Sequence, residues 1–160
     1  MPVDEQQFLD VMSAFPTGVV IVTTIAADGT PRGLTTNAFT SVSRDPPLLL
    51  VCLDRTSRTL PAVQESGRFV VHVMPEGRDA IARKFATKDD DKFDSVEWRP
   101  AGNGMPHLHV DSLAYAECTV EQAVEAGDHM IVVGLVEAGG IEPEAIPLVY
   151  FRRTYAGWRG

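Results

Sequence analysis

The feature that most constrains the fold is a dense run of β-branched residues followed closely by a turn. Residues 18–25 read Gly-Val-Val-Ile-Val-Thr-Thr-Ile, a composition typical of a strand. Asp28 and Gly29 follow, a pair that strongly favours a hairpin, and residues 33–36 lead the chain back. Because a hairpin joins neighbouring strands directly, this segment predicts antiparallel pairing.

The remaining apolar segments extend the same pattern. Further strands are predicted at 48–53, 68–74, 113–123, 130–138 and 147–151, which gives six or seven in all, and short helices at 4–15, 57–66 and about 78–86. The strands follow one another mostly back to back, which favours an antiparallel barrel with helices on its rim over a doubly wound sheet. We therefore expect a mainly β fold with short helices, in one domain spanning residues 1–160, since no linker or repeat divides the chain.

Composition limits the classes of function. The 160 residues carry 14 Lys and Arg against 22 Asp and Glu, a net charge of −8, which argues against binding to nucleic acid or to an anionic membrane. The two cysteines, Cys52 and Cys118, have no zinc-knuckle or CxxC spacing, which fits a reduced, cytoplasmic setting. The first ten residues have no signal-peptide character, and no apolar run reaches the ~20 residues of a membrane span. We expect a cytoplasmic protein.

One segment has the spacing of a metal site. In His107-Leu-His-Val-Asp111, three side chains could reach one metal ion, as at the start of the metallo-β-lactamase signature. Ser112 stands where that signature has its next histidine, and no further cysteine or histidine cluster completes the set. A polar loop entering a strand is the preferred interpretation, and we predict no metal.

Two segments have residue types that suit a phosphorylated, planar ligand. Residues 54–59, Asp-Arg-Thr-Ser-Arg-Thr, follow a buried strand and open a helix, whose free N–H groups and positive dipole end suit a phosphate. A solvated loop with an ordinary helix cap is the alternative. Residues 33–43 are rich in small hydroxyl side chains, which let a planar ligand approach the backbone. A threonine-rich edge strand would have the same composition.

Other nucleotide-binding motifs are missing, and one histidine stands out. Gly102-Asn-Gly104 and Gly139-Gly140 make no Rossmann fingerprint, and there is no Walker A lysine, so a nucleotide must be held in another way. His129 follows Gly127 and Asp128 at a predicted turn between strands. It is a candidate donor or orienting group, although a lone turn histidine is often only structural.

Taken together, the chain resembles the flavin reductase-like family, the small NAD(P)H:flavin oxidoreductases that feed two-component flavin monooxygenases. The similarity runs nearly end to end, in segments whose order and spacing are specific together. These segments are Phe15–Thr24, Gly33–Ser43, Pro46–Pro47, Cys52–Thr59, Phe85–Ala86, Asp91–Phe93, Gly127–His129 with Gly134 and Val136 after it, and Pro147–Tyr150.

The resemblance implies an FMN-binding split barrel, antiparallel and Greek-key-like, usually a homodimer with the flavin near the subunit interface. It implies hydride transfer from NADH or NADPH to N5 of FMN or FAD, and delivery of reduced flavin to a partner monooxygenase. The alternatives are a non-catalytic flavin-binding module of the same barrel, a flavin oxidase of the pyridoxamine-phosphate type, and, weakest, a zinc hydrolase using His107 and His109. An oxidase of that type would need several basic residues for a substrate phosphate.

The resemblance also assigns site residues one by one. The segment lining the isoalloxazine is Thr35, Thr36, Asn37 and Ala38. The strand end facing the ring and ribityl chain is Cys52, Leu53 and Asp54, and the phosphate side is Ser57, Arg58 and Thr59. Further cofactor contacts are Phe85, Ala86, Tyr150 and Tyr155, the last against the nicotinamide. His129 matches the histidine beside the nicotinamide and is the predicted catalytic residue.

One departure from the family pattern concerns the C-terminal turn. The family often ends Tyr-x-Arg-Gly-x-Tyr, whereas this chain has Arg153 in place of the glycine, between Tyr150 and Tyr155. If that glycine needs a positive φ, the last turn is expected to differ here.

Overall fold

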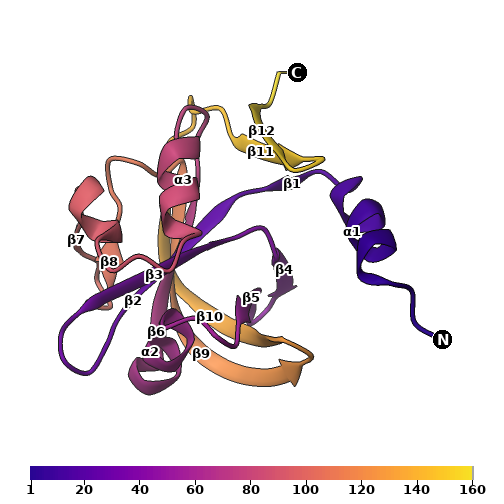
Figure 1. Ribbon diagram of the computed structural model, residues 1–160. Coiled ribbons are helices and arrows are strands. Elements are labelled where there is room, and N and C mark those ends of the chain that lie inside the picture. The colour runs from indigo at the N-terminus through magenta and orange to yellow at the C-terminus, as the bar shows by residue number, and fades with distance from the viewer. Residues whose placement is uncertain (160) are drawn as a thin grey trace.

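The computed structural model describes residues 1–159, and its centre is one strongly curved antiparallel sheet (Figure 1). Its seven strands lie in the order β3-β2-β6-β9-β10-β5-β4, and every neighbouring pair is antiparallel. The strands are β2 Val20–Ile25, β3 Pro31–Thr36, β4 Phe39–Arg44, β5 Pro47–Asp54, β6 Arg68–Val73, β9 Ala114–Ala126 and β10 His129–Ile141. The predicted mainly β, antiparallel class is confirmed.

Only two residues join the opposite edges of this sheet. β3 ends at Thr36 and β4 begins at Phe39, although the two strands stand at opposite ends of the strand order. The sheet must therefore curl until its edges approach each other, and the Thr36 hydroxyl donates to the Cys52 carbonyl there at 3.2 Å. No ladder joins β3 to β4 within residues 1–159, so the barrel stays open, as a split barrel requires.

Smaller elements flank the main sheet. β1 Thr17–Gly18, β11 Leu148–Phe151 and β12 Thr154–Gly157 form a second sheet, and β7 Arg99–Pro100 pairs with β8 Pro106–His107. The helices are α1 Glu5–Ser13, α2 Thr59–Ser66 and α3 Asp79–Phe85, with one 3-10 turn, η1 Lys92–Ser95. The twelve strands of the described chain correct the expected six or seven. β1, β7, β8 and β12 have only two to four residues and carry no readable periodicity, and the six-residue edge strand β4 lies in the segment rich in small hydroxyl side chains and was not predicted. No helix within residues 1–159 is both long and apolar enough to span a membrane.

The β-branched run of β2 is buried on both faces, which explains its nearly continuous apolar character. Val20 and Val22 belong to a cluster completed by Leu60 and Val63 of α2. Val19 and Ile21 belong to a second cluster, which also contains Phe85 of α3, Leu108 and Leu148 of β11. The two clusters hold α2 and α3 against the sheet, and both helices border the site described below.

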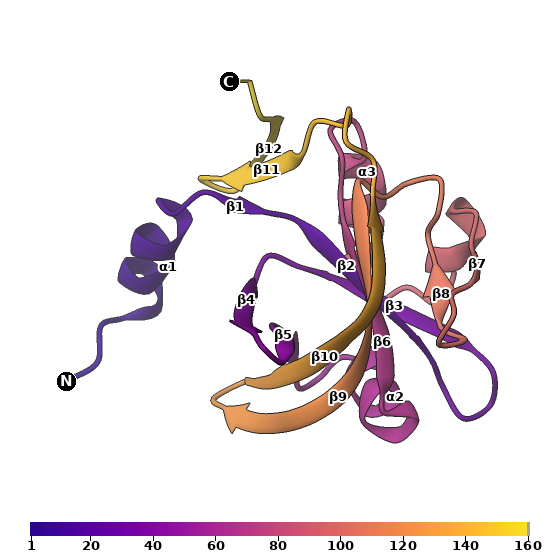
Figure 2. The ribbon, with the colours of Figure 1, turned by 180° about the vertical axis from the view of Figure 1, so that it is seen from behind.

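The predicted N-terminal helix is present, but its apolar face contacts little of its own chain. Asp4 caps α1, since its carboxylate accepts a hydrogen bond from the Gln7 N–H at 2.8 Å. No residue of α1 is buried, and the side chains of Phe8 and Phe15 are 55% and 67% exposed. Figures 1 and 2 show α1 standing apart from the body of the protein.

Both residues of the C-terminal turn, Arg152 and Arg153, adopt a left-handed backbone conformation. Phe151 pairs with Thr154, so the β11–β12 hairpin has a two-residue loop, Arg152 and Arg153, with φ of 48° and 63°. Two-residue loops of this kind match the twist of the flanking strands. Arg153 itself adopts the positive φ that glycine would favour, so the arginine does not prevent a left-handed residue at this position.

Candidate functional site

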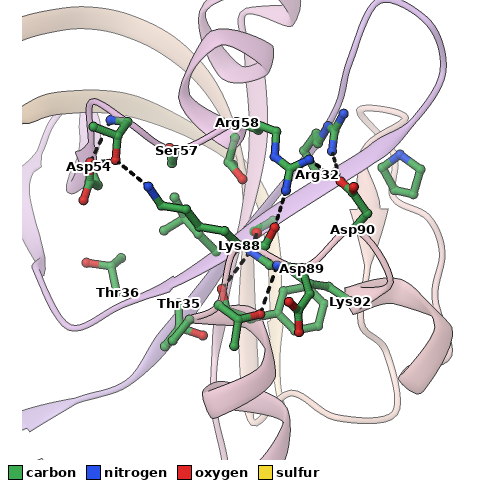
Figure 3. Close-up of a pocket in the computed structure, with 18 of the residues that line it drawn as sticks. Arg32, Thr35, Thr36, Asp54, Ser57, Arg58, Lys88, Asp89, Asp90 and Lys92 are labelled. Atoms are coloured by element: carbon green, nitrogen blue, oxygen red, sulfur yellow. Dashed lines mark hydrogen bonds and ion pairs between the residues drawn. The ribbon is translucent and has the colours of Figure 1, made fainter.

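The main cavity, of about 310 Å³, lies between β3, β5, the start of α2 and the loop that follows α3 (Figure 3). Eleven of the predicted site residues line it: Thr35, Thr36, Asn37, Cys52, Asp54, Ser57, Arg58, Thr59, Phe85, Ala86 and His129. Tyr150 and Tyr155 line a smaller neighbouring cavity of about 170 Å³, which shares Thr35, Thr36, Asn37 and Ala86 with the first. The tertiary structure thus brings together segments that are far apart in the chain.

Two of the predicted residues line neither cavity. Leu53 is fully buried in the sheet core, because alternation along β5 turns its side chain away from Cys52 and Asp54. Ala38 lies in the connection between β3 and β4, where its carbonyl accepts a hydrogen bond from the Cys52 N–H at 2.9 Å. These two residues therefore shape the cavity through the backbone rather than through their side chains.

The start of α2 forms one end of the cavity. The carboxylate of Asp54 accepts hydrogen bonds from the N–H and the hydroxyl of Thr56, both at 2.7 Å, and these bonds lower the pKa of Asp54. Ser57 Oγ accepts from the Leu60 N–H at 3.2 Å, so it satisfies one of the free donors of the first turn. Thr59 is buried. The turn is therefore well ordered, with the helix dipole directed at the cavity.

Small side chains and one close packing contact shape the other end. The Thr35 hydroxyl donates to the Ala82 carbonyl at 2.6 Å, which ties β3 to α3. Gly33 lies against the ring of Phe85, where an added Cβ would come within 2.9 Å of Cε2. The wall is therefore thin, and a planar group can approach the strand closely.

His129 reaches the cavity through strand register. β10 pairs with β5 so that His129 stands directly opposite Asp54, and Gly127 at φ 62° makes the preceding turn. Its Nδ1 lies 2.8 Å from the Asp128 carboxylate, and its side chain is 43% exposed. The contact with His129 lowers the pKa of Asp128. The imidazole is thus oriented by a neighbour and accessible to a ligand.

The thiols are poor nucleophiles. Burial raises the pKa of Cys52, which lines the cavity, and raises that of Cys118 to about 12. Both thiols are free and stay protonated at neutral pH. Cys52 therefore serves as part of the cavity wall.

Sequence reasoning missed a group of charged residues on the far wall. Arg32 on β3 and the loop after α3 contribute side chains to the cavity, and none of them is among the predicted site residues. Asp90 lies 3.4 Å from Arg32 and also contacts Arg58. The run of charged residues 88–92, Lys-Asp-Asp-Asp-Lys, was the available signal. Two of the partners, Arg32 and Arg58 of Asp90, lie more than 30 positions away along the chain, so the sequence alone did not assign this run a role.

Lys92 has a strongly lowered pKa in this wall. Its ammonium donates to the carbonyls of Gly33 and Phe85 at 2.9 and 3.0 Å, and so joins β3 to the end of α3. Burial lowers the pKa of Lys92 to about 8, with a further lowering from nearby Arg58. Its charge is therefore sensitive to a ligand placed beside it.

The side chains of the His107–Asp111 segment have other partners. The imidazole of His107 packs on the ring of Tyr115, with centroids 3.9 Å apart, and Asp111 forms an ion pair with Arg78. No group of three or more His, Cys, Asp or Glu side chains within residues 1–159 has the arrangement of a metal site. The geometry therefore offers nothing for the zinc hydrolase alternative.

Comparison with known proteins agrees with this geometry. Residues 12–159 match the family described as flavin reductase like domain. A flavin reductase (NADH) from Kitasatospora aureofaciens is 50% identical over 158 residues, 98% of this chain and 83% of that protein. The reductase subunit of a flavin-dependent monooxygenase from Mycobacterium tuberculosis is 37% identical over 157 residues, 97% of this chain and 83% of that protein.

A solved structure extends the similarity to the fold. An NADH:FAD oxidoreductase from Streptomyces globisporus, solved with NAD and FAD fragments, superposes with a TM-score of 0.90 at 32% identity. The alignment covers 99% of this chain and 97% of that one. The resemblance noted in the sequence is confirmed, and the chain belongs to the flavin reductase-like family.

Proposed function

We propose that this protein is an NAD(P)H:flavin oxidoreductase, which reduces FMN or FAD and supplies the reduced flavin to a partner monooxygenase. The observation that carries the proposal is the cavity, which joins a cation-rich helix start to a threonine-lined groove beside His129. The helix start suits the phosphate of a phosphorylated planar ligand, and the groove suits its ring. The relatives that are named flavin reductases or monooxygenase reductase subunits support the same activity.

The residues of the cavity suit the two ends of a flavin. Ser57, Thr59 and the free N–H groups of α2 would hold the phosphate, while Thr35, Thr36 and Asn37 would lie against the ring. A bound flavin supplies the hydride acceptor, N5. The protein has to stack the two rings, exclude water and stabilise negative charge with fixed donors, so no residue needs the pKa of a general acid or base.

The nicotinamide is proposed to enter where the two cavities meet. His129 would orient the dihydropyridine from the main cavity, while Tyr150 and Tyr155 border the smaller cavity, with ring centroids 5.1 Å apart. Aromatic rings that border a cavity can hold a flat ring against their faces. In this proposal His129 orients the dihydropyridine and transfers no proton in the hydride step.

We further propose a homodimer in the cytoplasm. The exposed apolar face of α1 contains Phe8, Val11 and Met12, and the exposed Phe15 follows the helix. No residue of α1 is buried in its own chain. A short amphipathic helix gains most of its stability from packing, so a second copy of the chain would complete it. Light scattering at micromolar concentration should give twice the monomer mass. A fully active monomer would contradict the proposal.

Steady-state kinetics test the activity. NADH and NADPH oxidation should be followed with FMN, FAD and riboflavin in turn, after chelation of metals. We expect NAD(P)H oxidation that depends on added flavin. A protein that binds flavin but never oxidises NAD(P)H would instead be a carrier or sensor, and activity restored only by zinc would also reject the proposal.

A further inference from the structure

The cavity contains four cationic side chains, and they differ in how far their charge is already compensated. Arg32 and Arg58 both contact the carboxylate of Asp90. Lys92 directs its ammonium to the carbonyls of Gly33 and Phe85. Lys88 is the fourth, and within residues 1–159 it forms no ion pair. A phosphate entering the cavity would thus meet four unequal partners.

Arg58 is engaged with the loop after α3. One terminal nitrogen of its guanidinium contacts the Asp90 carboxylate, and the other contacts the Lys88 carbonyl. The donors of a guanidinium lie in one rigid plane. Because both terminal nitrogens of Arg58 contact the loop, the donors they use are not available to a ligand in the cavity. Arg58 therefore fastens the loop to the start of α2.

The same loop is fastened from α3 as well. Lys84 lies 3.0 Å from Asp89 and 2.8 Å from Asp91, and these contacts raise the pKa of Lys84. The three consecutive acidic residues are thus paired with cations from β3, α2 and α3. Lys84 itself does not line the cavity. The loop is held on both sides, and Lys88 precedes the first of its acids.

Lys88 reaches from this loop across the cavity, as Figure 3 shows. Its ammonium donates to the Thr56 hydroxyl at 3.1 Å, and that hydroxyl donates in turn to Asp54. The side chain is exposed, and an ammonium has three donors, of which one is used here. Thr56 lies in the segment that leads into α2. Lys88 thus brings an ammonium with two unused donors, and with no direct ion pair within residues 1–159, beside the free N–H groups of that helix.

We propose that Lys88 supplies the positive charge for the flavin phosphate, and that Arg58 is a positioning residue that fastens the loop carrying Lys88. The inference rests on the proposed function and refines it, because the sequence resemblance had assigned the phosphate to Arg58 with Ser57 and Thr59. It makes Lys88 the side chain that contributes most to the preference for FMN over riboflavin.

Binding measurements without NAD(P)H test this assignment. Dissociation constants for FMN and riboflavin should be measured by quenching of flavin fluorescence, for the wild type and for Lys88→Gln, Arg58→Gln and Lys84→Gln. Each variant loses one positive charge, and Lys84→Gln is the matched control that loosens the loop from outside the cavity. The readout is the ratio of the riboflavin constant to the FMN constant, and circular dichroism checks that each variant is folded.

Lys88→Gln should lower this ratio by roughly 5- to 30-fold, the range for one charge-assisted hydrogen bond near solvent, with riboflavin binding unchanged. Lys88→Arg should restore most of the ratio, while Arg58→Gln and Lys84→Gln should each lower it less than about threefold. An unchanged ratio in Lys88→Gln, or an equal loss in Arg58→Gln, would overturn the assignment while leaving flavin binding intact. A wild type that binds neither flavin would overturn the proposed function as well.

Discussion

Gly33→Ala tests whether close packing between β3 and α3 shapes the cavity. The new Cβ would lie 2.9 Å from Cε2 and 3.1 Å from Cδ2 of Phe85, and 3.1 Å from the Val22 carbonyl oxygen. Phe85 is fully buried and packs edge-on against Phe93, with ring centroids 5.1 Å apart, so its ring cannot swing away freely. Overpacking of this kind costs about 1–3 kcal/mol, and the lower entropy of an unfolded alanine chain offsets about 0.4–1 kcal/mol.

The expected net loss is about 1–2 kcal/mol, or a Tm lower by roughly 3–6 °C for a chain of this size. Thermal unfolding followed by circular dichroism measures it. Gly18→Ala is the matched control, because nothing lies within 4 Å of its added Cβ, and its Tm should change by less than about 1 °C. Phe85→Leu in the Gly33→Ala background should cost less than Phe85→Leu alone. Equal Tm values for Gly33→Ala and Gly18→Ala would refute the packing argument.

Three further predictions concern the nicotinamide, the C-terminal turn and pH. His129→Ala should lower kcat/KM for NAD(P)H by roughly 5- to 30-fold, the cost of one orienting hydrogen bond, with the flavin Kd nearly unchanged; unaltered kinetics would end this assignment. Arg153→Gly should raise the free energy of unfolding by about 0.5–1 kcal/mol in denaturant titrations, because it relieves a left-handed residue at φ 63°, and a loss of stability would argue against strain. Burial lowers the pKa of Lys92 to about 8, so its charge is present below that pH and lost above it. A bound phosphate favours the charged form of Lys92, so the affinity for FMN relative to that for riboflavin should fall by roughly threefold or more between pH 7 and 9.5. A constant ratio would show that Lys92 does not interact with the phosphate.

Much of the architecture was readable because it depends on local chemistry. The β-branched run before Asp28 and Gly29 predicted the first hairpin, and the structure has β2 and β3 there. The three helices were also placed approximately, although α2 begins at Thr59, two residues after the expected start. The site residues were assigned from a different source, the resemblance to a family. Eleven of the residues assigned in this way line one cavity of the structure.

The charged wall of the cavity was not readable. Lys92 contacts the carbonyls of Gly33 and Phe85, and Asp90 contacts Arg32 and Arg58, all through pairings between separate elements. A run of charged residues usually lies on a solvated surface, so composition alone assigns these residues no role. Only the tertiary structure shows that Arg32 and Arg58 contact Asp90, whereas Lys88 reaches the Thr56 hydroxyl and forms no ion pair within residues 1–159.

The sequence by itself therefore determined most of the longer strands, the first hairpin and the approximate positions of the helices, because each depends on residues within one or two turns of chain. The tertiary structure decided the rest. Strand register set His129 opposite Asp54, and the curl of the sheet brought Thr36 to Cys52. It also left the apolar face of α1 without a partner in its own chain and held Arg153 in a left-handed turn. These outcomes depend on how elements pack and twist against one another, which the periodicity of a single segment does not encode.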